Sequence, residues 1–407
     1  MPGILAGIRV VDLTQYLAGP QATLFLAGLG AEVIRVDNPA TGDATANSAP
    51  FLGPEGVSLD RRTPDDLGVP YLKRARGKRA ITLNLKHPEG PGAFLALVRH
   101  ADVVVENWTV GTAARLGVDY AACRGVKPDI VYCSVTGYGQ TGPDAGARAY
   151  DNIVQAAAGL MSITGEPDGP PMKAGSAMAD TVAGTFAFAG ILGALFHRLR
   201  TGEGQHVDVS MADCLVALVL DESLDVWSAL GLPTRQGNRL PRLSPFNAYP
   251  TLDGWVAIGA ASEAEWSRLL EAIGRLDLKA DAGFMSPAWR LAHNDRVDAV
   301  IAEWARASKT AVAVDRLRSA EIACAPVRDM DAMKAWPQLA ARGMLEPLRH
   351  PTLGSLPAIV APGFPLKFSA TEVGYATAAP IVGQDNDAVW GDRLRLDVAA
   401  LRARGVI

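Results

Sequence analysis

The sequence has 407 residues, which is enough for two domains or for one large domain with an insertion. A net charge of −4, with 49% hydrophobic and 20% charged residues, indicates a globular protein and gives no electrostatic reason to expect nucleic acid as the main partner. The four cysteines are scattered without a CxxC pair, which argues against a disulfide framework or a zinc site and favours a reducing, cytoplasmic compartment.

The first half of the chain alternates between strand-like and helix-like segments. We expect strands at 8–13, 31–37, 81–85, 102–107 and 130–139, and helices at 20–30 and 88–100. This alternation favours an α/β fold, with a Rossmann-like large domain built on a mostly parallel sheet. Asp37 lies where dinucleotide-binding folds hold the ribose, but the first turn reads LAGPQAT instead of GxGxxG, so we do not expect NAD binding.

The second half begins with a long apolar helix and then changes in character. A helix is expected from Asp180 to about Arg200, followed by a strand at 206–210. Its most apolar part, 182–196, is shorter than the roughly 20 residues needed to cross a bilayer, and the N-terminus lacks the features of a signal peptide. We therefore expect a soluble protein with no membrane partner.

Composition also predicts the domain boundaries. Residues 1–224 form the large domain, 225–330 a smaller α/β domain, and the Pro- and Gly-rich stretch 331–407 returns to complete the large domain. The small domain is expected to contain the strand WVAIGA and helices at 263–274 and 294–306.

Candidate catalytic residues are few. The sequence contains no HExxH, no GxSxG and no P-loop, so it gives no support for metal-assisted or serine hydrolysis. Asp180 lies among small residues just before the apolar helix. Such an Asp is a good helix N-cap, and the helix dipole would also hold it ionised as a possible covalent nucleophile. The two interpretations are compatible.

The order of several longer segments carries more information. VVDLT, LGAEVIRVDNPATGD, KRAITLNLKHPEG, ADVVVENWTVGTAARLG, YCSVTGYGQTGP, AYDNIVQAAAGLMSITGEPDGPP and RTGEGQHVDVSMAD follow one another over roughly residues 8–214. In these segments the chain resembles the class III CoA-transferases of the CaiB/BaiF type, which include formyl-CoA transferase and α-methylacyl-CoA racemase.

The resemblance implies an activity, a nucleophile and an assembly. CoA would move from an acyl-CoA thioester to a carboxylic acid through an acyl–aspartyl anhydride and an aspartyl-CoA thioester, both formed on Asp180. It implies no metal and no cofactor beyond CoA itself, which acts as carrier and substrate. It also implies an interlocked homodimer.

The resemblance further implies two sets of contact residues. Those expected to hold CoA are Ala18, Asn84, Leu85, Lys86, Asn107, Trp108, Arg115, Arg148 and Tyr150. Those expected to contact the transferred acid are Gln15, Tyr150, Gly259, Ala260 and Ala261.

Two alternatives and one question about the substrate stay open. A 2-methylacyl-CoA racemase would need a histidine where Tyr150 stands and an acid near Ser262, so racemisation is disfavoured. A non-catalytic acyl-CoA binding protein is the second alternative. Several cations hint at a dicarboxylic donor such as succinyl-CoA, or are simply solvated loop charges: Arg61, Arg62, Lys73, Arg74, Arg76, Arg239 and Arg242.

Overall fold

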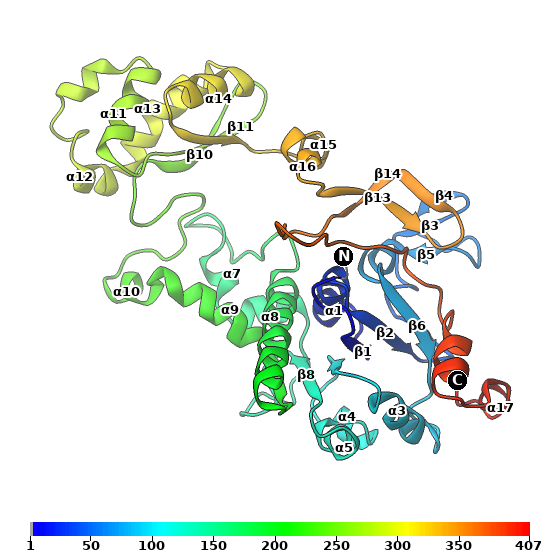
Figure 1. Cartoon of the computed structure of the whole chain (residues 1–407). Helices are drawn as coiled ribbons and strands as arrows, with labels where there is room; N and C mark the ends of the chain where they lie inside the picture. The colour runs from blue at the N-terminus through cyan, green and yellow to red at the C-terminus, as the bar shows by residue number, and fades with distance from the viewer. Residues whose placement is uncertain (1–2) are drawn as a thin grey trace. The chain divides into compact units, whose positions relative to one another are not determined.

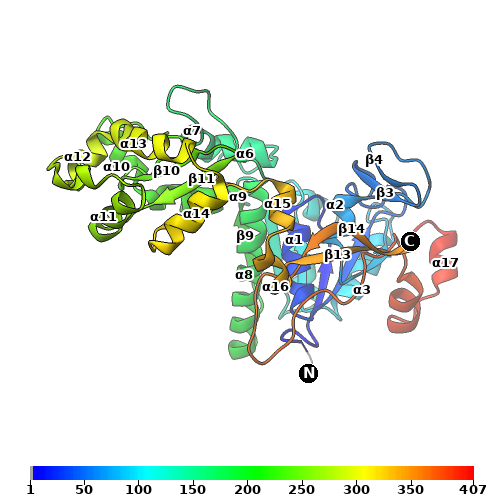
Figure 2. The same cartoon turned by 90° about the horizontal axis from the view of Figure 1, so that it is seen from above.

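The computed structural model describes residues 3–407 and divides into two compact units (Figures 1 and 2). Unit 1 contains Met1–Ala158, Gly175–Val219 and Pro337–Ile407, and unit 2 contains Gly159–Ala174 and Leu220–Trp336. The domain boundaries expected from composition, at 224 and 330, stay a prediction.

Unit 1 is built on a six-stranded parallel sheet. Its strands are β1 (Arg9–Asp12), β2 (Glu32–Asp37), β6 (Lys78–Thr82), β7 (Val103–Glu106), β8 (Val131–Thr136) and β9 (His206–Ser210). They lie in the order β6-β2-β1-β7-β8-β9. This confirms the predicted α/β fold with a Rossmann-like parallel sheet, because the order is that of doubly wound dinucleotide-binding sheets.

One strand is displaced from its expected position. The sequence pattern predicts a strand at ITLNL (81–85), whereas β6 is KRAIT and begins at Lys78. A lysine rarely lies in a buried strand. Here the Lys78 side chain is fully buried and its ammonium group lies 3.0 Å from the Asp12 carboxylate.

Helices cover both faces of the sheet. The helices of unit 1 are α1 (Ala18–Gly28), α2 (Val69–Arg74), α3 (Gly90–Val98), α4 (Thr112–Arg115), α5 (Tyr120–Val126), α6 (Asp151–Ala157), α8 (Met178–Thr201), α9 (Met211–Val219), α16 (Pro337–Ala341) and α17 (Val398–Ala403), with a π-helix η3 (Asp387–Arg393). On one face, α3, α5, η3 and α17 close a core that includes Phe94, Tyr132 and Trp390. On the other face α1 and α8 pack against each other, as Figure 1 shows.

Helix α8 is longer than the apolar stretch suggested. It has 24 residues and is the one helix among residues 3–407 that is long and apolar enough to cross a membrane by length and composition. The expectation that this segment is too short to span a bilayer was therefore wrong, because it counted the apolar stretch alone and not the whole helix. Its residues Ala183, Ala187 and Ile191 are buried in unit 1, as in the core helix of a globular protein.

Short antiparallel strands complete unit 1. They are β3 (Phe51–Gly53), β4 (Gly56–Ser58), β5 (Leu67–Gly68), β13 (Leu345–His350) and β14 (Gly354–Pro362). Leu52 and Leu67 from the early strands share an apolar cluster with Leu348 and Ala361 from the late hairpin. The C-terminal segment of the chain thus packs against the same unit as its N-terminal segment.

Unit 2 has its own sheet and core. The strands β10 (Phe246–Pro250), β11 (Trp255–Gly259) and β12 (Ala323–Pro326) form an antiparallel sheet. The helical segments are α7 (Leu160–Ile163), η1 (Leu220–Glu222), α10 (Leu224–Ala229), α11 (Glu263–Ala272), η2 (Leu276–Ala280), α12 (Pro287–Ala292), α13 (Asn294–Arg306), α14 (Thr310–Ser319) and α15 (Met330–Lys334). The fully buried Trp266 lies at the centre of this core.

Candidate active site

The strand order defines where unit 1 should bind a ligand. From β1 the chain proceeds through α1 to β2 on one side, and after β6 it crosses to β7 on the other side of β1. In open parallel sheets, ligands bind at the carboxyl ends of the strands where the direction of winding changes. That point lies between Asp12, the last residue of β1, and Glu106, the last residue of β7.

Two of the expected contact residues meet at this point. The Asn107 side-chain oxygen accepts the Gln15 N–H at 2.9 Å, and the Asn107 amide nitrogen donates to the Gln15 carbonyl at 2.7 Å. Asn107 follows β7 directly, and Gln15 lies in the turn between β1 and α1. The pair therefore fixes the β1–α1 turn to the end of β7.

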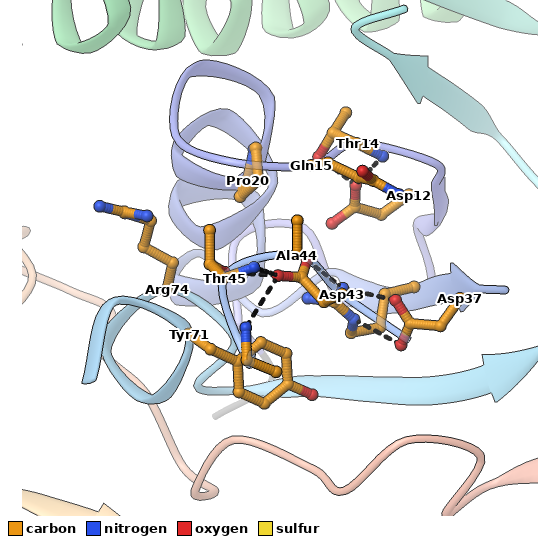
Figure 3. Close-up of polar contacts among 12 residues, drawn as sticks. Asp12, Thr14, Gln15, Pro20, Asp37, Asp43, Ala44, Thr45, Tyr71 and Arg74 are labelled. Carbon is orange, nitrogen blue, oxygen red and sulfur yellow. Dashed lines mark hydrogen bonds and ion pairs between the residues drawn. The ribbon is translucent and has the colours of Figure 1, made fainter. Parts of the chain in front are cut away.

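A buried carboxylate supports the same turn from below. Asp12 accepts the Thr14 N–H at 2.9 Å, and its other oxygen accepts the Thr23 hydroxyl at 2.7 Å and the Lys78 ammonium at 3.0 Å. Figure 3 shows Asp12 and Thr14 bonded at the end of β1. Burial lowers the pKa of Lys78, and the charge of Asp12 opposes this effect. The turn thus rests on a buried, mutually neutralising ion pair.

A second buried charge cluster lies beside β2. The Arg35 guanidinium binds Asp37 and Asp43, each at 2.6 Å, and packs over the Tyr71 ring. The charge of Arg35 keeps the pKa of Asp43 below its usual range despite burial. Asp37 is thereby engaged inside the fold, consistent with the expectation that it does not serve as a ribose-binding acid.

Arg74, in the last turn of α2, contacts the β1–α1 turn. Its Nη1 donates to the Tyr16 carbonyl at 2.8 Å. Tyr16 has φ 67°, a left-handed conformation that is uncommon for a residue other than glycine. In Figure 3 the Arg74 guanidinium points away from Asp43. Among residues 3–407, no carboxylate lies within ion-pair distance of Arg74, although the charge of Asp180 acts on it.

The first turns of α1 and α8 approach each other closely. Gln21 on α1 donates from its side-chain amide to the Thr181 carbonyl on α8 at 3.0 Å. A Cβ added at Gly184 would lie 2.6 Å from the carbonyl oxygen of Ala18, so only glycine fits there. The predicted contact residue Ala18 is the buried first residue of α1. The turn that carries Asp180 is therefore held against α1.

Asp180 lies inside the first turn of α8 and does not cap it. The helix begins at Met178, its N-cap residue is Ala177, and Ala177 makes no side-chain cap bond. The cap is supplied by Asp151, whose Oδ1 accepts the N–H groups of Ala179 at 2.8 Å and of Asp180 at 3.3 Å. The N-cap interpretation of Asp180 was wrong, because the sequence did not reveal a capping carboxylate on another helix.

The pKa of Asp180 shifts in the opposite direction to the one expected from the helix dipole. The helix dipole was expected to lower the pKa and hold the carboxylate ionised. Instead burial, followed by the nearby Asp151 carboxylate, raises the pKa of Asp180 to about 6, against the opposing charge of Arg74. Asp180 is partly buried. A carboxylate with this pKa is mostly ionised at neutral pH and is more basic than an ordinary aspartate.

Asn84, Leu85 and Lys86 follow the end of β6. The Asn84 N–H donates to the Val406 carbonyl at 2.7 Å, and its side chain accepts the Lys86 N–H at 3.1 Å. Leu85 packs against the core, whereas Lys86 is exposed. Lys86 is therefore the member of this group whose charge is available to an anion.

The remaining expected CoA contacts in unit 1 lie near the ends of β7 and β8. Trp108 is partly buried and packs against the core, and its backbone N–H donates to the Glu106 carboxylate at 2.8 Å. Arg115 is exposed at the end of α4 and is held by the Thr112 hydroxyl at 2.7 Å. Arg148 is exposed, and Tyr150, the residue before α6, is 64% exposed.

The expected acid contacts at 259–261 belong to unit 2. Gly259 is the last residue of β11, and a Cβ there would clash with the Phe246 ring at 2.6 Å. Ala260 is buried and Ala261 is exposed. Ser262, weighed as the position of a racemase acid, caps α11 in a capping box with Glu265. These residues thus form a strand end and a helix start.

The structure accounts for several of the cations considered for a second carboxylate. Arg76 is bound to Glu346 at 2.9 Å and to the Pro362 carbonyl, and Arg239 lies between Asp295 and Asp298. Arg242 has Glu222 at 3.7 Å and Arg62 has Glu55 at 3.8 Å, both on exposed side chains. Arg76 and Arg239 are therefore committed to the fold.

Within the described part of the chain, no group of three His, Cys, Asp or Glu side chains is arranged to hold a metal ion. Asp180 and Glu106 are the carboxyls of residues 3–407 whose pKa is raised. Glu106 is buried and engaged by Trp108 and Ser134. Of these two carboxyls with a raised pKa, Asp180 is thus the one that a ligand can approach.

Comparison with known proteins decides the family. A model of CoA-transferase family III matches residues 5–386. The chain belongs to the family III CoA-transferases. It is 37% identical over 386 residues to a succinate–glutarate CoA-transferase of Agrobacterium fabrum, covering 93% of each chain. It is also 37% identical to a succinyl-CoA:mesaconate CoA-transferase of Haloarcula marismortui, covering 94% of each.

The fold agrees with this membership. A solved structure of a CaiB/BaiF family protein from Brucella suis matches the whole of both chains with a TM-score of 0.81 at 30% identity. The protein is therefore an enzyme that transfers CoA between carboxylic acids, and the relatives do not favour the racemase alternative.

Proposed function

We propose that CoA transfer by this enzyme proceeds through covalent intermediates on Asp180. The Asp180 carboxylate attacks the donor thioester carbonyl, the C–S bond breaks, and an acyl–aspartyl anhydride and CoA thiolate form. The thiolate then attacks the aspartyl carbonyl and releases the donor acid as a carboxylate. This leaves an aspartyl-CoA thioester. The acceptor carboxylate then attacks the aspartyl-CoA thioester, which forms a new acyl–aspartyl anhydride and CoA thiolate. The thiolate attacks the acyl carbonyl of the acceptor, which yields the new acyl-CoA and frees the Asp180 carboxylate. No net proton or electron is consumed.

One observation carries this proposal: Asp180 is partly buried and accessible, with its pKa raised to about 6. At pH 7.5 the group is mostly ionised, so it can attack without a separate base. Its higher basicity makes it a better nucleophile than an ordinary aspartate. The small residues Ala177, Ala179 and Gly184 around it leave room for the thioester.

The direct test is a mass measurement on the Asp180 peptide. The enzyme is mixed with succinyl-CoA alone, quenched in acid and digested. We expect a CoA adduct on that peptide and, with hydroxylamine present, the hydroxamate of Asp180. Asp180→Asn should show neither adduct nor activity, while Asp144→Asn, an exposed loop variant, should behave as the wild type. Full activity of Asp180→Asn would refute the proposal.

We propose that the CoA phosphates are held by exposed cations at the carboxyl end of the sheet. Lys86 follows β6 and Arg115 ends α4. An arginine can bind two phosphate oxygens at once. Arg115→Gln should raise the KM for acyl-CoA about 10-fold, as expected for the loss of a charge-assisted hydrogen bond. Arg124→Gln, at the exposed end of α5, is the matched control.

We propose that the transferred acids are dicarboxylic and that Arg74 binds the carboxylate that does not react. The relatives named above act on succinate, glutarate and mesaconate, each of which has two carboxyl groups. Arg74 is partly buried, has no ion-pair partner among residues 3–407, and is coupled electrostatically to Asp180. A desolvated guanidinium without a carboxylate partner suits a charged part of the substrate.

The remaining proposals concern the acid site and the assembly. Gln15 and Tyr150 of unit 1 are proposed to contact the transferred acid, and so, separately, are Gly259, Ala260 and Ala261 of unit 2. The enzyme is proposed to be a cytoplasmic homodimer. Phe196 and Leu199 on α8 are 61% and 83% exposed, which is consistent with a partner covering this end of the helix. Light scattering should give the mass of two chains. A monomer would contradict this proposal.

A further inference from the structure

The carboxylate that caps α8 comes from a different helix. Asp151 is the first residue of α6, and its Oδ1 accepts the N–H groups of Ala179 and Asp180 at 2.8 and 3.3 Å. These N–H groups lie in the first turn of α8, where no intrahelical acceptor is available. The backbone of the proposed nucleophile is thus bonded directly to the Asp151 side chain.

Asp151 is itself held in place. Its Oδ2 accepts the side-chain N–H of Gln155, one turn along α6, at 2.7 Å. Gln155 is completely buried and also donates to the Ser176 carbonyl at 3.3 Å, just before α8. Both carboxylate oxygens of Asp151 therefore have fixed donors. The side chain cannot turn away from α8 without breaking these bonds.

The charges around Asp180 in unit 1 are few and opposed. Asp151 on α6 disfavours the ionised form of Asp180, and Arg74 on α2 favours it. Helix α1, which packs along α8, has no ionisable side chain. The acids on α9 and β9, Asp213 and Asp208, do not contribute to the pKa shift of Asp180. Asp151 is consequently the charge that makes Asp180 more basic.

We propose that Asp151 is a positioning residue of the transferase, which fixes the first turn of α8 against α6 and holds a negative charge beside Asp180. This rests on the proposed role of Asp180 as the nucleophile. The fixed turn keeps the Asp180 carboxylate aligned for attack on the thioester, since small displacements of a reacting group slow catalysis strongly. The neighbouring negative charge raises the basicity of the nucleophile, and hence its reactivity toward a carbonyl carbon.

The two roles of Asp151 can be separated by substitution. Asp151→Asn keeps an oxygen that can accept the α8 N–H groups but removes the charge. We expect the acid limb of the pH profile of kcat/KM to move to lower pH, so that activity at pH 5 rises relative to that at pH 8. Asp151→Ala removes the cap as well, and kcat should fall about 10- to 100-fold. The succinyl-CoA half-reaction, followed by adduct formation on Asp180, avoids titration of the acceptor acid.

Asp119→Asn is the matched control. Asp119 caps α5 through the Ala122 N–H at 3.0 Å, which is the same bond on a helix that carries no proposed nucleophile. This variant should keep the wild-type pH profile and kcat. Circular dichroism on each variant shows that it is folded.

The outcomes also distinguish this inference from the proposed function. If Asp180→Asn is inactive and forms no adduct, but the acid limb of folded Asp151→Asn matches that of the wild type, the role of Asp151 is refuted while covalent catalysis stands. If Asp180→Asn is active, both are refuted. A shifted limb in Asp151→Asn, with an unchanged limb in Asp119→Asn, supports the inference.

Discussion

Asn107 and Gln15 hold each other through two hydrogen bonds of 2.9 and 2.7 Å, across the point where the winding of the sheet changes direction. The bonds use both ends of the Asn107 carboxamide, the oxygen as acceptor and the nitrogen as donor. Asn107 was expected to contact CoA. That contact stays a prediction. In the structure its side-chain oxygen and amide nitrogen bond to the backbone of the β1–α1 turn, so Asn107 also shapes that turn.

Asn107→Ala should therefore loosen the turn that presents Gln15. Each lost bond to a partly buried backbone group costs about 1 kcal/mol, so we expect a loss of about 1–3 kcal/mol in the free energy of unfolding. The kcat/KM should fall about 10-fold. Urea unfolding and initial rates measure the two effects. Asn294→Ala, which removes a single bond to the Leu291 carbonyl in unit 2, is the control. Unchanged kinetics of Asn107→Ala would contradict this role.

Asp180→Asn should be more stable than the wild type at alkaline pH. A carboxyl whose pKa rises on folding, here from 3.8 to about 6, binds its proton more tightly in the folded state. It therefore contributes stability below pH 4 that is lost as the pH rises through 6. The neutral amide avoids this loss. We expect a gain of up to about 3 kcal/mol at pH 8, and about half of that at pH 5.

Urea unfolding of both proteins at the two pH values measures this difference. Asp144→Asn, in an exposed loop, should show no comparable gain. A variant that is less stable than the wild type at pH 8 would mean that Asp180 is stabilised as a carboxylate. The raised pKa would then be wrong.

The sequence predicted the elements of unit 1 well where the pattern is local. β9 was placed correctly because HVDVS lies between a glycine-rich turn and a helix start. β6 was displaced because Lys78 is buried only through its pairing with Asp12, which lies 66 residues earlier in the chain. Such a pairing leaves no periodic signal in the sequence.

The same limit explains the error at Asp180. A single sequence shows an acid next to a helix start, and the local rule assigns it the cap. The real cap, Asp151, lies 28 residues before Ala179 on another helix. The pKa of Asp180 depends on its burial, on this neighbour and on Arg74, so neither the direction of the shift nor its cause follows from the local sequence.

Lys78→Met should strongly destabilise the protein. The ammonium of Lys78 is buried between Asp12, the Thr23 hydroxyl and the Pro20 carbonyl, at 2.8–3.0 Å. Removing it leaves Asp12 as a buried charge without its partner, which costs about 3–5 kcal/mol. Arg79→Met changes the next residue, whose ion pairs are exposed, and should cost less than about 1 kcal/mol. Equal effects of the two variants in urea unfolding would contradict this account.

A double variant tests whether the loss of stability in Lys78→Met comes from the unpaired charge of Asp12. Asp12→Asn with Lys78→Met leaves no buried ion, so part of the loss should be recovered. The Pro20 carbonyl and the Thr23 hydroxyl in α1 would still lack their bonds to the Lys78 ammonium, so the kcat of the double variant should stay below that of the wild type.

Arg74→Gln should change which acids the enzyme accepts. Loss of a charge-assisted bond to the second carboxylate costs about 1.5–3 kcal/mol, so kcat/KM for succinate and glutarate should fall about 10- to 100-fold. Acids with one carboxyl group, such as acetate, should be affected only a few-fold, because they never had that bond. Competition between glutarate and acetate for one CoA donor measures the ratio directly. Arg342→Gln, an exposed arginine of unit 1, is the control.

The contact of Arg74 with Tyr16 makes the comparison of acids essential. Because Arg74 Nη1 also supports the Tyr16 carbonyl, the substitution can disturb the turn between β1 and α1. Such a disturbance would lower the rates for acids with one and with two carboxyl groups by the same factor. A selective loss for dicarboxylic acids therefore identifies Arg74 as the residue that binds the second carboxylate, and an equal loss for both classes assigns it to the turn alone.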